Sequence, residues 1–314
     1  MKKIFLSLLT AALTFGLAAA QDLETATNIY NSGAEALQLG NKESALQKFQ
    51  EALKVAQALG EEGQDIVTNS KNAIPGIILS IGKDLYNNKD FAGASAKFAE
   101  AEKLAAEYGV AEIAEEAKGL KTQAATMEDF EAGEAAREAK NYAAAAQAYK
   151  KVLAVDSTNA VAALYLGQSL GSTGDVKGAV EAYELAGRHG QESVAQQQIS
   201  TLYLKQAAAK LKAQKYQDAI EYAEKANSVK EDDQTYLVAG QAASKLGKNN
   251  DAIKYYERFL ELAPKSKNAP AIAFTVGALY HQAGNKAKAV EFYKKVLNDP
   301  KFGANAKKMI DALN

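Results

Sequence analysis

The sequence predicts an all-α fold, an α-solenoid of about seven helix–turn–helix repeats closed by a C-terminal capping helix. Three observations carry this prediction: small residues that recur at a fixed spacing, aromatic residues at a fixed distance from them, and glycines and prolines that fall between the expected helices. A fixed pattern at long period is the signature of a repeat array. Such arrays generally present a long surface rather than house one reaction centre.

A small residue marks the first helix of each repeat, and an alanine follows it twelve positions later. Because two antiparallel helices approach closely only where side chains are tiny, each pair is expected to mark a helix crossing. The small residues are, in chain order, Gly33, Gly82, Gly133, Gly167, Ala207, Gly240 and Gly277. The alanines are Ala45, Ala94, Ala145, Ala179, Ala219, Ala252 and Ala289.

An aromatic residue follows four positions after the alanine in every repeat except the fifth. Residues three, four and seven apart share one face of a helix, so the aromatic is expected to fill the wedge beside the crossing. The aromatics are Phe49, Phe98, Tyr149, Tyr183, Tyr256 and Tyr293. The fifth repeat has Ala223 at this position, and Tyr222 beside it is expected to compensate in part. It also has Gln206 and Lys210 where apolar residues are expected.

Turn residues separate the two helices of each repeat. In four repeats a glycine can supply the positive φ that ends a helix, namely Gly40, Gly174, Gly247 and Gly284. In three others the turn reads Lys89-Asp90-Phe91, Lys140-Asn141-Tyr142 and Gln214-Lys215-Tyr216, with an aromatic over the crossing.

The prolines agree with this phasing. Pro75 and Pro270 are expected in the first turn of a first helix, where proline is tolerated. Pro264 and Pro300 are expected after a second helix. No proline is therefore expected inside a helix.

The segment Leu164-Tyr165-Leu166-Gly167, followed by Gly174-Asp175, Ala179, Tyr183 and Ala186, resembles the tetratricopeptide repeat family, a unit of about 34 residues. Leu262-Ala263-Pro264 is similar to the proline that ends a repeat in that family. The resemblance covers roughly residues 25–297. It implies that the first helices line a concave wall, and that the protein interacts with other proteins through this groove. The carboxylate clamp that the family uses to hold a peptide C-terminus is not reproduced.

The predicted organisation has four segments. Residues 1–20 are a cleaved signal peptide, residues 21–125 are N-terminal repeats with lengthened inter-repeat helices, residues 126–297 are C-terminal repeats, and residues 298–314 are the capping helix. Two inserts, at residues 60–74 and 109–125, are interpreted as lengthened helices or as an added helix. The capping helix places Ala306, Met309, Ile310 and Leu313 on one face.

The N-terminus predicts export. Lys2 and Lys3 precede an apolar stretch and then Ala18-Ala19-Ala20, the pattern of a secretory signal peptide. The chain has no cysteine, which excludes disulfides, thiolate metal sites and the lipid anchor of a bacterial lipoprotein. We expect a soluble protein of the periplasm or cell envelope of a Gram-negative bacterium. A net charge of −1 argues against nucleic acid as a partner, and no other segment is apolar enough to span a membrane.

Motifs for chemistry are weak, and neither a catalytic residue nor a metal or cofactor site is expected. His189 and His281 lack neighbouring ligand-type residues, and the glycine-rich run 167–178 lacks the ending of a phosphate-binding loop. Asp156-Ser157-Thr158-Asn159 lacks the glutamate of a calcium loop and predicts a turn between repeats, with Ser157 and Thr158 capping a helix. Asp232-Asp233 is expected at a helix start.

The expected groove provides the candidate binding residues. Three positions before each small residue the side chain is large and apolar, which predicts either packing between repeats or a row that grips a peptide. That row is Tyr30, Leu79, Phe130, Leu164, Leu204, Leu237 and Phe274. Varied residues lie one or four positions after the small residue, and the candidates drawn from both sets are Tyr30, Lys83, Tyr86, Phe130, Glu134, Arg137, Gln168, Gln241, Phe274 and His281.

These observations favour a non-enzymatic scaffold that binds a protein or peptide in the cell envelope. The alternative is a periplasmic module that binds glycans or folding clients. Two further readings stay open: an enzyme with an unrecognised site, and self-association through the N-terminal helix near residues 23–39, which has no preceding repeat to cover it.

Overall fold

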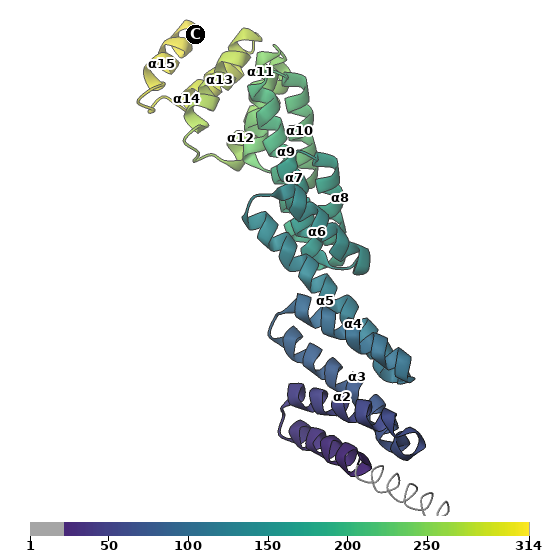
Figure 1. Ribbon diagram of the computed structural model, residues 1–314. Coiled ribbons are helices and arrows are strands. Elements are labelled where there is room, and N and C mark those ends of the chain that lie inside the picture. Colours follow the sequence, from purple (N-terminus) through teal and green to yellow (C-terminus); the bar gives the residue numbers. More distant parts are fainter. Residues whose placement is uncertain (1–21, 314) are drawn as a thin grey trace, which may run out of the picture. The chain divides into compact units, whose positions relative to one another are not determined.

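A computed structural model of the chain describes residues 22–313, and every regular element in that range is helical (Figure 1). The predicted all-α repeat fold is confirmed. The described chain divides into two compact units, one ending at Glu134 and the other beginning at Ala135. The predicted signal peptide lies outside the described residues, and the predicted division into four segments stays a prediction.

The first unit contains a helix at residues 22–38, α2 (Lys42–Ala58), the 3-10 turn η1 (Gly60–Gly63), α3 (Gln64–Asn87), α4 (Phe91–Tyr108) and most of α5 (Ala111–Glu138). Its core forms where α2, α3 and α4 pack against one another, and it buries Phe49, Ile74, Ile78 and Phe98. Residues 64–74 are continuous with α3 and residues 111–125 with α5, so both inserts lengthen helices.

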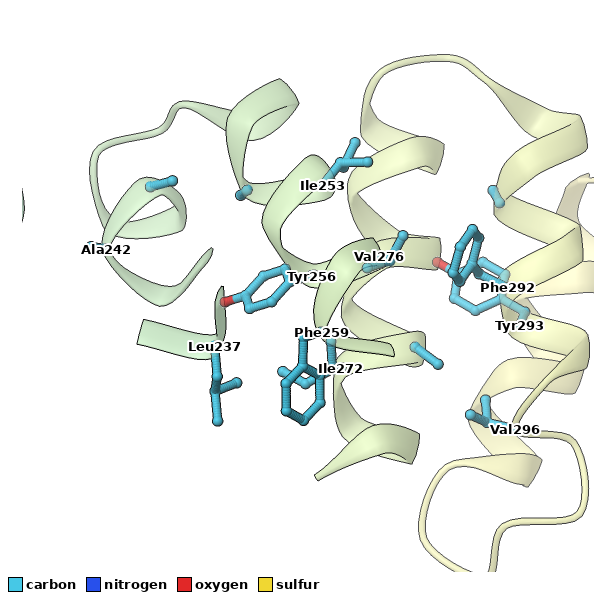
Figure 2. Packing of buried hydrophobic residues seen from close by; sticks show 14 of the residues in the cluster. Leu237, Ala242, Ile253, Tyr256, Phe259, Ile272, Val276, Phe292, Tyr293 and Val296 are labelled. Carbon is cyan, nitrogen blue, oxygen red and sulfur yellow. The ribbon is translucent and has the colours of Figure 1, made fainter. Parts of the chain in front are cut away.

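The second unit continues with helix pairs (Figure 1). They are α6 (Tyr142–Val155), α7 (Ala160–Thr173), α8 (Val176–Ala186), the π-helical turn η2 (Gly187–Gln191), α9 (Glu192–Lys212), α10 (Tyr216–Val229), α11 (Asp233–Lys245), α12 (Asn249–Leu262), α13 (Ala269–Gln282), α14 (Lys286–Lys294) and α15 (Gly303–Leu313). Figure 2 shows the aromatic residues Tyr256, Phe259, Phe292 and Tyr293 between neighbouring helices of its C-terminal half.

Helix crossings place an aromatic ring directly over a glycine. A Cβ at residue 167 would lie 2.7 Å from two ring carbons of Tyr183, and a Cβ at residue 240 would lie 2.5 Å from Cε1 of Tyr256. The alanine twelve positions after the small residue is fully buried in each repeat. No larger side chain fits between the two helices at these points.

The turn inside each repeat uses one backbone conformation whatever its sequence. Gly40, Gly174, Gly247 and Gly284 have φ between 72° and 92°. Lys89, Lys140 and Gln214 take the same left-handed conformation, with φ of 64°, 59° and 60°. Most L residues avoid this region, so three turns hold strained residues that the sequence pattern did not predict.

In several repeats, the residue directly after this left-handed residue caps the following helix. The side chains of Asn41, Asp90, Asn141, Asp175 and Asn285 each accept a hydrogen bond from a backbone N–H in the first turn. This satisfies one of the donors that a helix start leaves unpaired.

Three expectations need correction. Pro75 lies inside α3, not at its start, because the insert extends the helix back to Gln64. The helix after Asp156 is capped by Asn159, whereas Ser157 and Thr158 are not caps. In α15, Met309 is exposed, since only Ala306 and Leu313 of the predicted face are fully buried and Ile310 is partly buried.

Candidate binding surface

In the first unit, side chains of the same or the next repeat contact three of the candidate groove residues. The Tyr30 ring meets Phe49 edge-on with centroids 5.0 Å apart, and Tyr86 meets Phe91 at 5.1 Å. The Lys83 ammonium lies 2.6 Å from a carboxylate oxygen of Glu116, which belongs to α5. Phe130 and Glu134 are half-buried on α5. All five candidates of this unit are therefore only partly accessible to a partner.

In the second unit, two candidates are fixed by aromatic rings. The Arg137 guanidinium lies 4.4 Å from the centroid of the Tyr165 ring, a cation–π contact between α5 and α7. The Tyr165 ring is in turn 5.6 Å from that of Tyr149. A flat, charged side chain held in this way keeps one orientation.

Phe274 on α13 is held in the same manner. Its ring lies 5.3 Å from Tyr293 and 5.5 Å from Phe302, so it contributes mainly to the packing of the last repeats. By contrast, Gln168 on α7, Gln241 on α11 and His281 on α13 are exposed. They are the candidates most available to a partner.

The row of large apolar residues on the first helices is mostly covered. Leu79 and Leu237 are buried, and the five others are half-buried. The packing interpretation therefore accounts for Leu79 and Leu237 completely. The half-buried members retain an accessible part next to the exposed polar positions.

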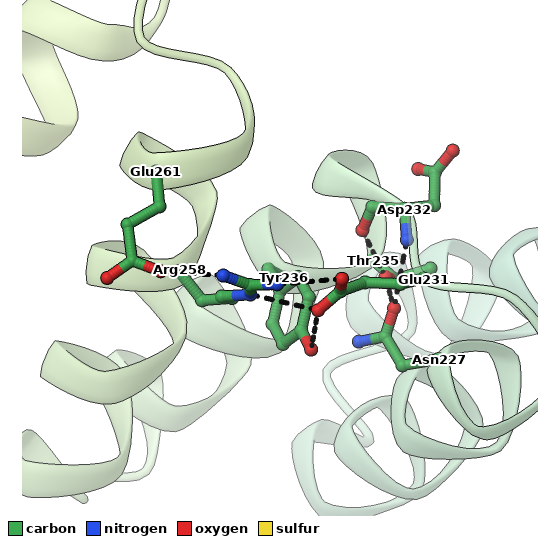
Figure 3. A network of polar contacts seen from close by, with 7 residues as sticks. All are labelled: Asn227, Glu231, Asp232, Thr235, Tyr236, Arg258 and Glu261. Atoms are coloured by element: carbon green, nitrogen blue, oxygen red, sulfur yellow. Dashed lines mark hydrogen bonds and ion pairs between the residues drawn. The ribbon is translucent and has the colours of Figure 1, made fainter.

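Polar contacts connect α10, α11 and α12 (Figure 3). Arg258 on α12 donates two hydrogen bonds to the carboxylate of Glu231, at 2.9 and 2.8 Å, and a third to Glu261. The Tyr236 hydroxyl also donates to Glu231. The hydrogen bonds from Arg258 and Tyr236 lower the pKa of the Glu231 carboxyl. These residues fix the loop that joins two repeats.

The start of α11 continues this polar group. Asp232 caps the helix by accepting from the backbone N–H of Gln234, which agrees with the helix start expected at Asp232-Asp233. Fully buried Thr235 donates to the side-chain carbonyl of Asn227. The sequence pattern predicted the cap but not the hydrogen bonds from Arg258 to Glu231, because these two residues lie 27 positions apart.

A tyrosine–glutamate hydrogen bond recurs between neighbouring repeats. The Tyr255 hydroxyl donates to Glu224 at 2.5 Å, and the Tyr280 hydroxyl donates to Glu257 at 2.8 Å. Burial, followed by the hydrogen bond to the glutamate, raises the pKa of Tyr255, and the same causes raise that of Tyr280 to about 12. Both glutamates stand seventeen positions after the small residue of their repeat.

Residues 22–313 contain no group of three or more His, Asp or Glu side chains arranged to hold a metal ion. His189, in η2, and His281 are both exposed. No helix among these residues combines the length and apolar character that a membrane span requires.

Comparison with known proteins identifies the repeats. Models described as tetratricopeptide repeat match residues 136–201 and 237–305, both in the second unit. No curated protein matches the chain.

Among the solved structures similar to the chain, two are described with the term TPR. A crystal structure of MamA protein is 23% identical, covers 58% of this chain and 94% of its own, and has a TM-score of 0.36. YrrB, described as a TPR protein with an unusual peptide-binding site, is 21% identical to this chain. The match covers 57% of this chain and 90% of YrrB, with a TM-score of 0.32. The TPR domain of P58(IPK) is 15% identical, with 92% and 97% covered and a TM-score of 0.28. With two segments matched by the family's models, the chain contains tetratricopeptide repeats in its second unit.

Proposed function

We propose that this protein is a non-enzymatic scaffold of the bacterial cell envelope that binds a partner polypeptide through the first-helix face of its second unit. Tetratricopeptide repeats support the general role of a protein-interaction scaffold. Export rests on the basic and apolar N-terminal sequence alone, as does the assignment to the envelope of a Gram-negative bacterium.

One observation carries the proposed binding face. Gln168 and Gln241 occupy the same position in two repeats, directly after a buried glycine, and both are exposed. His281 is exposed four positions after the equivalent Gly277. A rigid scaffold thus presents varied polar groups at regular intervals, and amide side chains both donate and accept hydrogen bonds to a peptide backbone.

Arg137 and the half-buried apolar row complete the proposed face. Arg137 supplies a positive charge held in place on the Tyr165 ring. The half-buried Leu164 and Leu204 supply apolar area beside the exposed glutamines. Apolar area would supply affinity, and the polar groups would select the partner.

The test is site-specific crosslinking in envelope extract. A photo-crosslinking amino acid replaces Gln168, Gln241 or His281 in turn, and the matched control places it at Lys254, an exposed position on second helix α12. The proposal expects one polypeptide to be captured from the three groove positions and not from the control. Equal capture from all four positions would show non-specific contact and contradict the proposed face.

The result also separates the alternatives. Capture of many unrelated polypeptides from the groove positions would indicate binding of folding clients. Retention on glycans without any captured polypeptide would indicate a glycan-binding module. Crosslinks to a second copy of the chain, removed by dilution, would indicate self-association.

A further inference from the structure

The junction between the fourth and fifth repeats, in the second unit, lacks the tyrosine–glutamate hydrogen bond that is present at the next two junctions. Glu184 on α8 stands seventeen positions after Gly167, the position that Glu224 and Glu257 hold in the next two repeats. Glu224 and Glu257 each accept a hydrogen bond from a tyrosine hydroxyl of the following repeat. Among the described residues, no tyrosine donates to Glu184.

The same junction holds an open hollow of about 640 Å³ between α8, α9 and α10. Its size falls within the range of small-ligand sites, ~300–1,000 Å³. Smaller side chains explain the space. The hollow is lined by Val176 and Val180, whereas Tyr216 and Ile220 occupy the same repeat positions at the next junction and belong to its packed core.

The fifth repeat keeps a tyrosine beside this hollow, at the repeat position of Tyr255, but has no ring at the following position. Ala223 takes the position that other repeats give to a ring, and it packs against Ala207 and Ala239 instead. Tyr222, one position earlier, lines the hollow with Tyr203, and their ring centroids are 6.1 Å apart. Within the described chain, neither hydroxyl hydrogen-bonds to another residue. The hollow thus offers two aromatic surfaces and an acceptor, Glu184.

The charges around the hollow favour a ligand that carries an acidic group next to the part that enters the hollow. Lys210 forms an ion pair with Asp218 at 3.1 Å, and Lys177 lies 3.8 Å from Glu181. The Lys225 ammonium lies 5.2 Å from the Tyr222 ring centroid and has no ion-pair partner among the described residues. It is therefore available to a carboxylate from outside the chain.

We infer that this hollow binds a tyrosine side chain of a partner polypeptide, flanked by an acidic residue. The incoming hydroxyl donates to Glu184, as Tyr255 does to Glu224 within the chain. The ring packs against Tyr203 and Tyr222, and the flanking carboxylate pairs with Lys225.

This site is separate from the proposed groove. Tyr203, Gln206 and Lys210 line the hollow from α9, whereas Leu204 belongs to the groove row of the same helix. At 3.6 residues per turn these two sets are roughly a third of a turn apart. The inference thus stands whether or not the groove binds a partner.

The probe is the peptide Gly-Ser-Asp-Tyr-Ser-Gly, titrated into the isotopically labelled chain and followed by amide chemical shifts. We expect saturable shifts at Tyr203, Tyr222 and Glu184, which disappear when the peptide tyrosine is replaced by alanine. Replacing the peptide aspartate by lysine is expected to weaken binding at least about threefold. Shifts that do not saturate, or that persist without the tyrosine, would overturn the inference.

Two variants of the protein sharpen the test. Val176→Tyr fills the hollow with the residue that closes the next junction, and it is expected to weaken peptide binding at least about tenfold while helix content by circular dichroism is unchanged. If that variant unfolds, Lys225→Glu provides the second test, because it should reverse the preference between the aspartate and lysine peptides. The matched control Lys254→Ala should bind like the unchanged chain.

The outcomes distinguish this site from the groove and from a sugar site. Val176→Tyr should leave crosslinking from Gln168 and Gln241 intact. Loss of those crosslinks as well would mean that the hollow and the groove are one surface, and the inference would be wrong. A trisaccharide such as maltotriose that shifts Tyr203 and Tyr222 when the peptide does not would assign the hollow to glycans and refute the tyrosine occupant.

Discussion

Gly167→Ala tests the crossing geometry most directly, because the contact is with a ring that cannot move into solvent. A Cβ at this position would lie 2.7 Å from Cδ1 and Cε1 of Tyr183, about 0.8 Å inside a normal carbon–carbon contact of ~3.5 Å. Tyr183 is only 5% exposed on α8. Either the ring or the helix pair must shift to accept the methyl group.

Two opposing effects set the magnitude. Replacing glycine by alanine inside a helix favours folding by about 1 kcal/mol. Overpacking a buried contact costs about 1–3 kcal/mol, and the closeness of two ring carbons places this case in the upper part of that range. The net expectation is a destabilisation of about 1–2 kcal/mol for Gly167→Ala.

Gly171→Ala is the matched control in the same helix, one turn later. Its Cβ would meet the end of the Leu202 side chain at 3.3 Å and Ala179 Cβ at 3.6 Å, contacts that a small side-chain adjustment relieves. Here the helix-propensity gain should prevail, with a stabilisation of up to about 1 kcal/mol.

Urea denaturation followed by circular dichroism measures both variants. Hydrogen exchange of α7 and α8 should accompany it, because repeat arrays need not unfold in one step. The two substitutions should differ by about 1–3 kcal/mol and have opposite signs. Two changes of the same sign and similar size would refute the reasoning that a ring held over Gly167 sets the helix spacing.

Three further predictions concern the second unit. Lys140 has φ 59°, so Lys140→Gly should relieve about 0.5–1 kcal/mol of left-handed strain and raise the urea midpoint. Gly174 has φ 92°, so Gly174→Ala should reduce the free energy of unfolding by about 1 kcal/mol and lower the urea midpoint. Burial raises the pKa of Tyr183 from 10.0 to about 12, so the unfolded chain releases the hydroxyl proton at a lower pH than the folded chain does. The stability that the neutral Tyr183 hydroxyl contributes is complete below pH 10 and is lost between pH 10 and 12. In Tyr183→Phe, the free energy of unfolding should therefore fall less steeply with pH over this range. Arg258→Ala removes the hydrogen bonds to Glu231, so amides at the start of α11 should exchange faster, with a difference that shrinks at high salt.

The helix pairs could be predicted because their main contact joins a small residue and an aromatic residue at a fixed spacing in the sequence. Gly240 and Tyr256 are sixteen positions apart, and the structure places the ring against the glycine. Such a contact depends on two short helices and one turn, so it survives differences in every other residue. The repeat period therefore revealed the fold without any knowledge of how one repeat meets the next.

The helix ends were harder to predict. Pro75 marks a helix start in the repeat pattern, but Ile74, Ile77 and Ile78 bury themselves on a helix that begins eleven positions earlier at Gln64. Burial of that apolar face outweighs the backbone hydrogen bond that proline cannot donate. Lys140 gave no sign of a left-handed turn because that conformation normally signals glycine.

The candidate site was predictable only in part. Its positions on the first helices followed from the spacing, but the partners of each side chain did not. Arg137 lies on the ring of Tyr165, 28 positions away, and Lys83 pairs with Glu116, 33 positions away. These contacts join successive repeats, and residues of ordinary charge and aromatic type carry no marker in sequence for such a pairing.

Departures from the repeat pattern carry more functional information than its regular positions. Ala179, Ala219 and Ala252 are all fully buried at helix crossings, so they stabilise each repeat in the same way and do not distinguish this array from another. Ala223 is different: its missing ring coincides with the tyrosine pair and the open hollow beside Glu184. An irregular residue that merely weakened packing would leave a dry gap lined by apolar groups. The hollow is instead lined by charged side chains and by two tyrosines, a residue type that is enriched where proteins meet other molecules.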